Sequence, residues 1–291
     1  MKTMKRSLLP PVVLAAGVMI TTGVLAPRAD AGLTYPVENA GQDWKWGVTL
    51  DYTLREVDRT ETYLSEGMPP RDWSVTYDAY DANMWGFTIF VTPPCFANTM
   101  IDFSYRTGDL EGKFKNRALD PASMYYGESF AGRADFDRDE FEVGVTYPFP
   151  NMSWLYARAE WFWAEEDGDW DYGEGEIETQ EYDMWGITAG MGAMQEFTFG
   201  ASDVTLVLNA FAGLVYFDLE HTETTDPANH LTTAWSGWAY QGRVGARLAY
   251  PVQEGTDVFL GVGYEILEAD DSGLDMTTDG FFANLGVMGE W

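Results

Sequence analysis

Residues 44–55 spell WKWGVTLDYTLR, in which every second side chain is apolar. The apolar positions are Trp44, Trp46, Val48, Leu50, Tyr52 and Leu54. Alternation with a period of two predicts a β-strand with one apolar and one polar face. The fold is decided by the recurrence of this pattern along the chain. Ten such segments lie at roughly 43–55, 83–92, 99–107, 139–147, 154–164, 183–194, 203–217, 236–250, 256–267 and 280–291.

The lengths of the segments and of their connections point to one architecture. About ten residues are what a tilted β-strand needs to cross a bilayer. Short connections at Pro93–Asn98, Pro148–Ser153, Gln195–Ser202 and Pro251–Gly255 alternate with long ones at about 56–82, 108–138, 165–182, 218–235 and 268–279. The pattern predicts an all-β, transmembrane, antiparallel up-and-down β-barrel of about ten strands. Both termini and the short periplasmic turns would lie on one side, and long acidic extracellular loops on the other.

The N-terminal residues indicate an exported protein. Lys2, Lys5 and Arg6 precede an apolar stretch that runs from about Leu8 to Ala26, and Ala29-Asp30-Ala31 is a small-x-small cleavage motif. These features predict a secretory signal peptide at 1–31, followed by one barrel domain at 32–291. No later segment has the roughly 18 consecutive apolar residues of a membrane-spanning helix.

Composition limits the partners of the mature chain. After residue 31 there are 13 basic and 46 acidic side chains, a net charge of −33. Such a charge repels nucleic acid and attracts divalent cations or basic partners. Cys95 is the only cysteine, so an internal disulfide is impossible. The sequence has no dinucleotide, phosphate-loop or haem-attachment motif, so no cofactor is expected apart from weakly bound Ca²⁺, as argued below.

The C-terminal segment, residues 281–291, spells FFANLGVMGEW. It alternates apolar residues and ends on an aromatic, and so resembles the C-terminal assembly signal of bacterial outer-membrane β-barrel proteins. Aromatic residues also fall near the ends of the predicted strands, where a membrane interface would hold them. The resemblance covers the mature chain as a pattern and matches no specific subfamily. It implies a monomer integral to the cell outer membrane, contacts with membrane lipid and lipopolysaccharide, and assembly machinery that recognises the strand ending at Trp291.

Alternation assigns the polar face of each strand to the barrel interior. The predicted interior charges are Lys45, Asp51, Arg55, Asp102, Arg106, Glu140, Glu142, Arg158, Glu160, Arg243, Arg247, Glu265 and Glu290. Six basic and seven acidic groups in a narrow lumen should pair, because an unpaired buried charge is costly. We therefore expect a largely plugged lumen, with a narrow pore for small solutes or cations as the alternative.

One acidic stretch resembles a calcium loop. Asp167, Asp169, Asp171 and Glu178 have the 1, 3, 5 and 12 spacing of oxygen ligands in such loops. Position 6 is Tyr172 instead of the usual glycine, and no helices flank the stretch. Weak binding of Ca²⁺ is one expectation, and a solvated acidic loop is the other.

An enzyme is the third function to consider. Ten-stranded barrels include the omptin surface proteases, which use a pair of Asp residues facing an Asp–His pair. The corresponding candidates here are Asp78, Asp81, Asp218 and His221. Asp218 and His221 are three positions apart, whereas the pair in that family is two apart, so no local motif matches. The expected function is a structural, surface-interaction or receptor-like role without catalysis. Alternatives are a narrow porin and, after it, an omptin-like protease.

Overall fold

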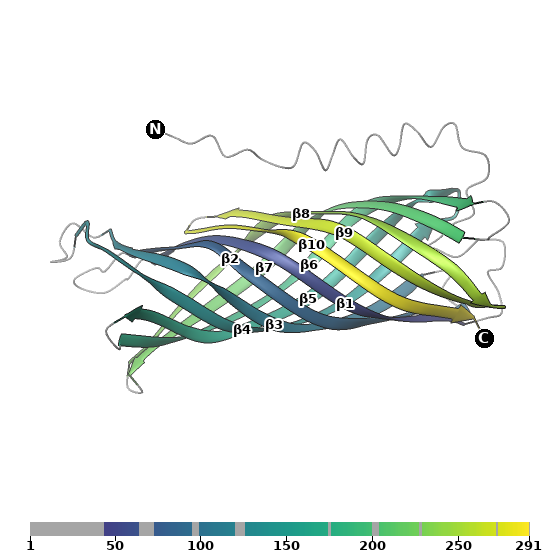
Figure 1. Cartoon of the computed structure of the whole chain (residues 1–291). Coiled ribbons are helices and arrows are strands. Elements are labelled where there is room, and N and C mark those ends of the chain that lie inside the picture. The colour runs from purple at the N-terminus through teal and green to yellow at the C-terminus, as the bar shows by residue number, and fades with distance from the viewer. Residues whose placement is uncertain are drawn as a thin grey trace.

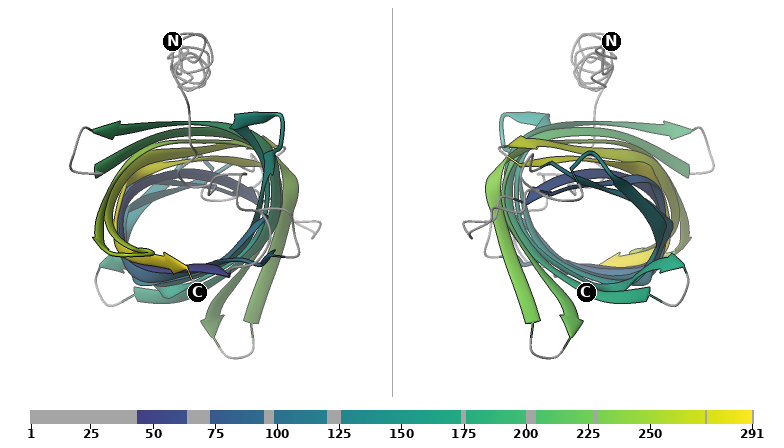
Figure 2. Two further views of the ribbon diagram at one scale, coloured as in Figure 1. Left: turned by 90° about the vertical axis from the view of Figure 1, so that its right-hand side faces the viewer. Right: turned by 90° about the vertical axis from the view of Figure 1, so that its left-hand side faces the viewer.

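The computed structural model describes residues 44–63, 73–94, 99–119, 126–173, 176–199, 204–226, 229–271 and 273–290. Ten antiparallel strands within them form a closed barrel (Figures 1 and 2). The strands are β1 (Lys45–Tyr63), β2 (Trp73–Thr92), β3 (Met100–Ala118), β4 (Ser129–Phe149), β5 (Met152–Gly173), β6 (Glu176–Phe199), β7 (Val204–Asp226), β8 (Asn229–Gln253), β9 (Thr256–Asp271) and β10 (Leu274–Glu290). The architecture predicted from the alternation is confirmed.

Each strand pairs with its neighbours in sequence, and the first and last strands close the ring. The closing register places Lys45 opposite Glu290 and Leu50 opposite Leu285. The start of β1 and the end of β10 therefore lie at the same end of the barrel, and the half of the barrel next to them is called the terminal half. The other half, which holds the end of β1 and the start of β10, is called the distal half.

The strands are longer than predicted, and the expected bounds of the long loops were wrong. β5 continues to Gly173 and β6 begins at Glu176, although 165–182 was assigned to a loop. β7 likewise continues to Asp226, and β8 begins at Asn229. The charged side chains that suggested a loop are instead the outward face of continuous strands.

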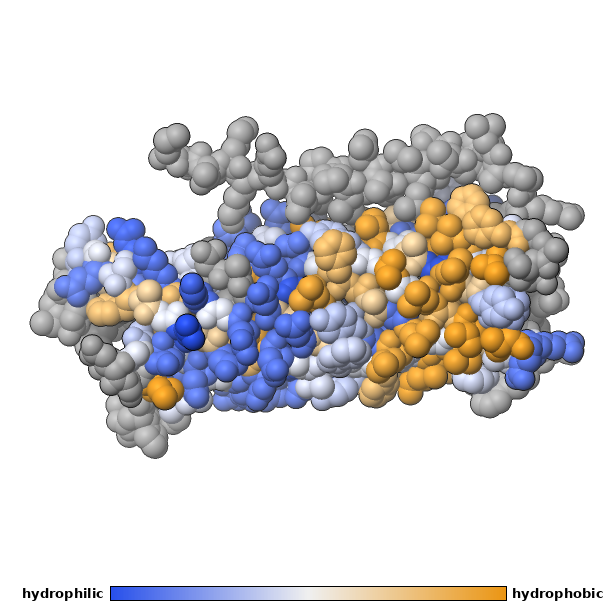
Figure 3. All heavy atoms as spheres, viewed as in Figure 1, coloured by the Kyte–Doolittle hydropathy of each residue, from blue (hydrophilic) through white to orange (hydrophobic). Residues whose placement is uncertain are grey.

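The polarity of both faces reverses halfway along the barrel, while the strands continue and keep one buried and one exposed face, apart from register shifts near Val57 and between Asp78 and Asp81. On β5, Trp161 and Trp163 face outward in the terminal half, and Glu165 and Asp167 face outward beyond them. Figure 3 shows the consequence as an apolar zone toward the right, where β10 ends in Figure 1, and a hydrophilic zone to its left. The inward face changes in the opposite sense, from Glu160 to the fully buried Trp170.

The inside of the distal half is therefore packed like the core of a water-soluble protein. Its buried cluster includes Tyr77, Phe114, Phe136, Trp170 and Phe217. The Phe114 and Trp170 rings stack with centroids 5.0 Å apart. The Phe136 and Tyr182 rings meet edge to face at 5.7 Å. These rings therefore form an apolar core in the interior of the distal half.

Several sequence predictions lie outside the described residues. They are the signal peptide at 1–31, Cys95 and the final Trp291. In the part of the chain that is described, no helix has the length and apolarity to cross a membrane.

Candidate functional site

The interior of the terminal half contains an ion-pair network centred on Arg158. Its guanidinium donates two hydrogen bonds to Asp102, at 2.6 and 2.7 Å. It also donates to Glu142 at 3.1 Å and to Glu160. Gly144 faces this group from β4, and a Cβ there would lie 2.3 Å from an Arg158 nitrogen. A glycine at this position is thus what allows the guanidinium to lie against the barrel wall.

The network continues through Arg243 and Arg55 toward the middle of the barrel. Arg243 pairs with Glu160 at 2.7 Å and with Glu265 at 3.4 Å. Arg55 pairs with Glu265 at 2.6 Å and with Glu140 at 2.5 Å. Glu140, Glu160 and Glu265 are each shared by two or more arginines, so every charge in this part of the network has a partner of opposite sign.

A further part of the network was missed by the sequence prediction. Arg138 joins Glu140 at 2.7 Å to Glu166, and Arg59 joins Glu166 at 3.0 Å to Glu61 at 2.8 Å. Arg59, Glu61, Arg138 and Glu166 lie in the segments assigned to loops, whereas Glu140 was predicted. Extending the alternation from Arg55 to Val57, Arg59 and Glu61 would have found two of them. In all, the ion pairs join six arginines to seven carboxylates across the described interior.

Nine of the thirteen predicted interior charges belong to these ion pairs, and four are placed differently. Asp51 accepts hydrogen bonds from Thr49 at 2.7 Å and Thr88 at 2.6 Å. The Arg247 guanidinium lies 4.9 Å from the Phe259 ring centroid. Lys45 is buried at the start of β1, and the Glu290 side chain lies outside the described residues.

Two cavities lie on either side of one layer of this network. The one toward the distal half has a volume of about 90 Å³ and is lined by Arg55, Arg138, Phe162 and Met184 among others. The other, of about 230 Å³, is lined by Asp51, Asp102 and Arg247 among others. Arg106, Glu142 and Arg243 line both cavities. This layer of three charges is therefore the boundary between the two cavities.

Above the network, Arg59 enters the apolar core between two tyrosines. Its guanidinium lies 4.6 Å from the Tyr77 ring centroid and 4.1 Å from that of Tyr182. The two tyrosine hydroxyls hydrogen-bond to each other. Burial favours the neutral carboxyl of Glu166, but Arg59 and Arg138 outweigh burial and lower the pKa of Glu166. The cluster thus holds ionised side chains inside an aromatic core.

His221 completes this cluster. Its ring stacks on Tyr182 with centroids 4.2 Å apart, and its Nε2 lies 2.6 Å from Gln180 Oε1. Burial, together with Arg59, lowers the pKa of His221 to about 3. The imidazole is therefore neutral at physiological pH.

The depressed pKa of His221 predicts acid sensitivity. The unfolded chain takes up a proton near pH 6.5 and the folded chain only near pH 3, so stability is lost as pH falls through this window. At pH 4.5 we expect a loss on the order of 2 kcal/mol relative to pH 7.5. Guanidinium unfolding of the barrel in detergent measures it. His221→Phe keeps a stacked ring but cannot titrate, so its stability should change less over this range; an equal loss would contradict the assignment.

The three catalytic candidates whose side chains are described, Asp81, Asp218 and His221, do not come together. His221 faces inward and is buried, whereas Asp218 and Asp81 face outward. Asp78 lies in β2 next to a register shift, and its side chain is outside the described residues. Asp218 and His221 are an odd number of positions apart, which places them on opposite faces of one strand. The Asp–His arrangement suggested by the omptin resemblance is therefore not formed by this pair.

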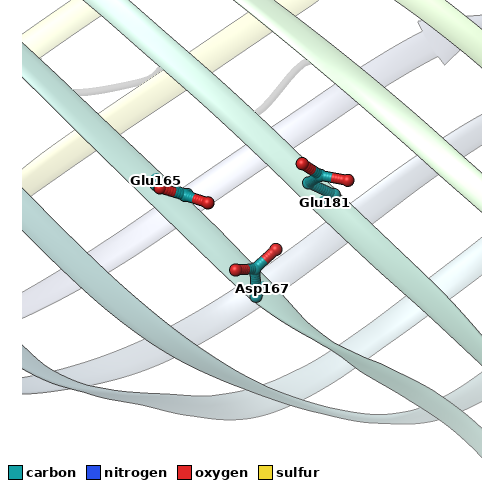
Figure 4. A group of neighbouring side chains, drawn as sticks. All are labelled: Glu165, Asp167 and Glu181. Atoms are coloured by element: carbon teal, nitrogen blue, oxygen red, sulfur yellow. The ribbon is translucent and has the colours of Figure 1, made fainter.

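The calcium-loop candidates do not converge either, because 165–173 is a strand. Asp167, Asp169 and Asp171 face outward along β5, while Glu178 lies on the inward face of β6 and accepts a hydrogen bond from Tyr172 at 3.0 Å. A different group forms instead on the outer wall: the carboxylate oxygens of Glu165, Asp167 and Glu181 lie within 4.8 Å of one another (Figure 4). Burial and the surrounding carboxylates raise the pKa of Glu165. Oxygen ligands of this kind suit Ca²⁺, and weak binding stays a prediction.

The fold and the charged interior can now be compared with known proteins. No protein-family model matches the chain, and no curated protein sequence does. Among solved structures it is similar to the outer membrane protease OmpT of Escherichia coli, with a TM-score of 0.57 and 13% identity over 86% of this chain and 97% of that one. Weaker similarities include the translocator domain of the autotransporter NalP from Neisseria meningitidis (TM-score 0.46, 10% identity, 88% and 91% covered) and the neisserial surface protein NspA (TM-score 0.32, 11% identity, 84% and 97% covered).

These findings define the class: the chain has the fold of a bacterial outer-membrane β-barrel protein. At 13% identity the likeness to OmpT concerns the fold alone. The function has to be argued from the interior and from the outer wall.

Proposed function

We propose that the protein is an integral, monomeric outer-membrane β-barrel with a closed lumen, and that it acts at the cell surface in a structural, surface-interaction or receptor-like role. The main support is the double closure of the interior. Ion pairs cross the interior of the terminal half, and aromatic side chains pack in the interior of the distal half. A barrel that transports solutes needs an open path, and a packed distal core would block that path.

The proposed location follows from the outer surface. The terminal half exposes large apolar side chains, among them Leu50, Trp85, Ile187 and Leu285. Exposure of this apolar surface to water would be unfavourable in free energy, whereas contact with lipid is not. We propose that this half spans the membrane, with lipopolysaccharide around its outer rim, and that assembly depends on the strand ending at Trp291.

Arginine substitutions can locate the edge of the membrane. Leu285→Arg places a charge in the middle of the apolar zone and should cost about 2–4 kcal/mol of stability in lipid vesicles. Ala234→Arg places the same side chain outward in the distal half, next to Glu220, and should change stability by less than about 0.5 kcal/mol. Equal effects of the two substitutions would show that the apolar zone does not lie in lipid.

Single-channel recording in planar bilayers tests the closed lumen. We expect no steady conductance, because the layer of ion pairs and the aromatic core lie one after the other along the lumen. Steady openings on the order of hundreds of picosiemens would contradict the proposal and favour a pore.

A narrow channel is the second candidate, and one observation favours it. Arg106, Glu142 and Arg243, together with Ser104, line both cavities of the terminal half. The double variant Arg106→Ala/Arg243→Ala would join them. If this variant still conducts no ions, the aromatic distal core is a second barrier, as the proposed function requires.

A further inference from the structure

The basic side chains of the barrel are distributed unequally. Of the 13 that follow residue 31, eight face the interior of the barrel: Lys45, Arg55, Arg59, Arg106, Arg138, Arg158, Arg243 and Arg247. Arg71 lies outside the described residues. The remaining four are Lys113, Lys115, Arg117 and Arg133, which all face outward near the tip of the β3–β4 hairpin. We call these four residues the basic tip.

The basic tip differs from the rest of the distal outer wall, which is acidic. The outward acids on β3 to β7 are Asp109, Glu111, Asp135, Asp137, Asp139, Glu165, Asp167, Asp169, Asp171, Glu181, Asp183, Asp218 and Glu220. If the bases served to neutralise this wall, they would be spread among its carboxylates. Instead, they are gathered at one end of one hairpin.

Two of the four basic residues have an acidic cross-strand neighbour and two do not. Lys113 lies opposite Arg133 on one side and opposite Asp78 on the other, and Arg133 also lies opposite Asp171. Lys115 is flanked by Thr76 and Ala131, and Arg117 by Ser74 and Ser129, so the cross-strand neighbours of both are uncharged. Among the described residues none of the four forms an ion pair, and all four are exposed. The charges of Lys115 and Arg117, which have no charged neighbour on either adjacent strand, are therefore the most available to a ligand.

The height of the basic tip excludes the lipid headgroups as that ligand. Tyr105 is the last outward aromatic of the apolar zone on β3, eight positions before Lys113 and twelve before Arg117. With about 3.3 Å per residue and a strand tilt of about 40°, the two basic residues lie roughly 20 and 30 Å above it. The headgroup layer is only about 5–7 Å thick. The basic tip therefore projects well beyond the bilayer.

We propose that the basic tip is a docking site for an anionic polysaccharide, bound through its sulfate or phosphate groups. Four cations on one hairpin suit a short run of such groups, which arginine and lysine bind by charge-assisted hydrogen bonds. Tyr126, exposed in the turn between β3 and β4, offers a ring face for a sugar. A polysaccharide touches this small patch through a few residues, whereas a nucleic acid duplex would bring a dense row of charges against the acidic wall.

The inference rests on the proposed function, because it requires the distal half to face the outside of the cell. The test uses the full mature chain in nanodiscs of zwitterionic lipid, where both ends are accessible. Fluorescent heparin is the anionic probe, and uncharged dextran and a DNA duplex are the comparison probes. Binding is measured over a series of salt concentrations.

We expect heparin to bind in a salt-dependent way, dextran not to bind, and DNA to bind at least tenfold more weakly than heparin. The variant Lys113→Gln/Lys115→Gln/Arg117→Gln should weaken heparin binding at least tenfold. The matched variant Asp109→Asn/Asp135→Asn/Asp137→Asn alters the same hairpin and should bind heparin at least as tightly as the unchanged protein. Arg133→Gln, a milder change, should give an intermediate affinity.

No binding of heparin, or equal binding by the glutamine variant, would overturn the site. Equal binding of DNA would overturn the assignment to a polysaccharide. Trypsin cleavage of the basic tip on intact cells tests its orientation separately. If the tip resists trypsin on cells while the protein in nanodiscs still binds heparin, the proposed function is wrong and the binding site is retained.

Discussion

Replacing Arg158 by alanine is expected to lower the free energy of unfolding by about 3–5 kcal/mol. The substitution removes one guanidinium and leaves Asp102, Glu142 and Glu160 to share the remaining cations. Removal of one partner from a buried ion pair is costly, because the other partner keeps its desolvation penalty. Asp102 would be affected most, since Arg158 is its only partner among the described ion pairs. Urea unfolding in lipid vesicles measures the loss.

Arg117→Ala is the matched control for this experiment. It removes the same side chain from an exposed position without an ion pair, so the expected change is below about 0.5 kcal/mol. If Arg158→Ala also lost less than about 0.5 kcal/mol, water would have to solvate Asp102, Glu142 and Glu160. The lumen would then be open, and the closed-barrel function would fail with it.

The strand pattern was predictable because each strand has one apolar and one polar face in both halves of the barrel, and successive side chains of a strand point to opposite faces. What the sequence did not reveal was that the pattern continues where its polarity reverses. At the step from Trp163 to Glu165 an apolar outward position is followed by a charged one, and charge was taken to mean a loop. The backbone does not distinguish the two cases, since a strand needs only one apolar face, and that face can point inward as well as outward.

The interior site was predictable to the same extent. Residues inside the predicted strands, such as Arg158 and Glu265, were assigned to the lumen by alternation alone. Arg59, Glu61, Arg138 and Glu166 were missed because they belong to the segments taken as loops. The ion-pair partner of each charge could not be predicted from the sequence, because it depends on which strands face each other across the barrel. Arg55 meets Glu265 from β9 and Glu140 from β4, and no local spacing encodes either contact.

The reversal also separates two structural tasks within one set of strands. In the terminal half the lipid side is apolar, so the narrow interior receives the polar side chains and must neutralise them by pairing. In the distal half water covers the outside, so the interior is free to be an aromatic core. We infer that the distal half is stabilised mainly by apolar burial and the terminal half by a combination of lipid contact and ion pairing.

Trp170→Ala tests this division. Trp170 is fully buried and contacts Phe114, Tyr77 and His221 at ring distances of 5.0, 6.0 and 6.0 Å. Truncation removes the largest side chain of the distal core and leaves a cavity that the surrounding strands cannot close. The expected loss is about 3–5 kcal/mol, measured by guanidinium unfolding.

Trp161→Ala is the comparison on the same strand, because Trp161 faces outward in the terminal half with 40% of its surface exposed. Lipid can fill the space left by an outward ring, so this variant should lose less than half as much as Trp170→Ala. Equal losses would show that the distal interior is not a packed core. The Trp170→Ala barrel should still conduct no ions, because the layer of Arg106, Glu142 and Arg243 lies across the lumen on the terminal side of Trp170. A stable open pore in this variant would mean that the aromatic core alone had closed the barrel.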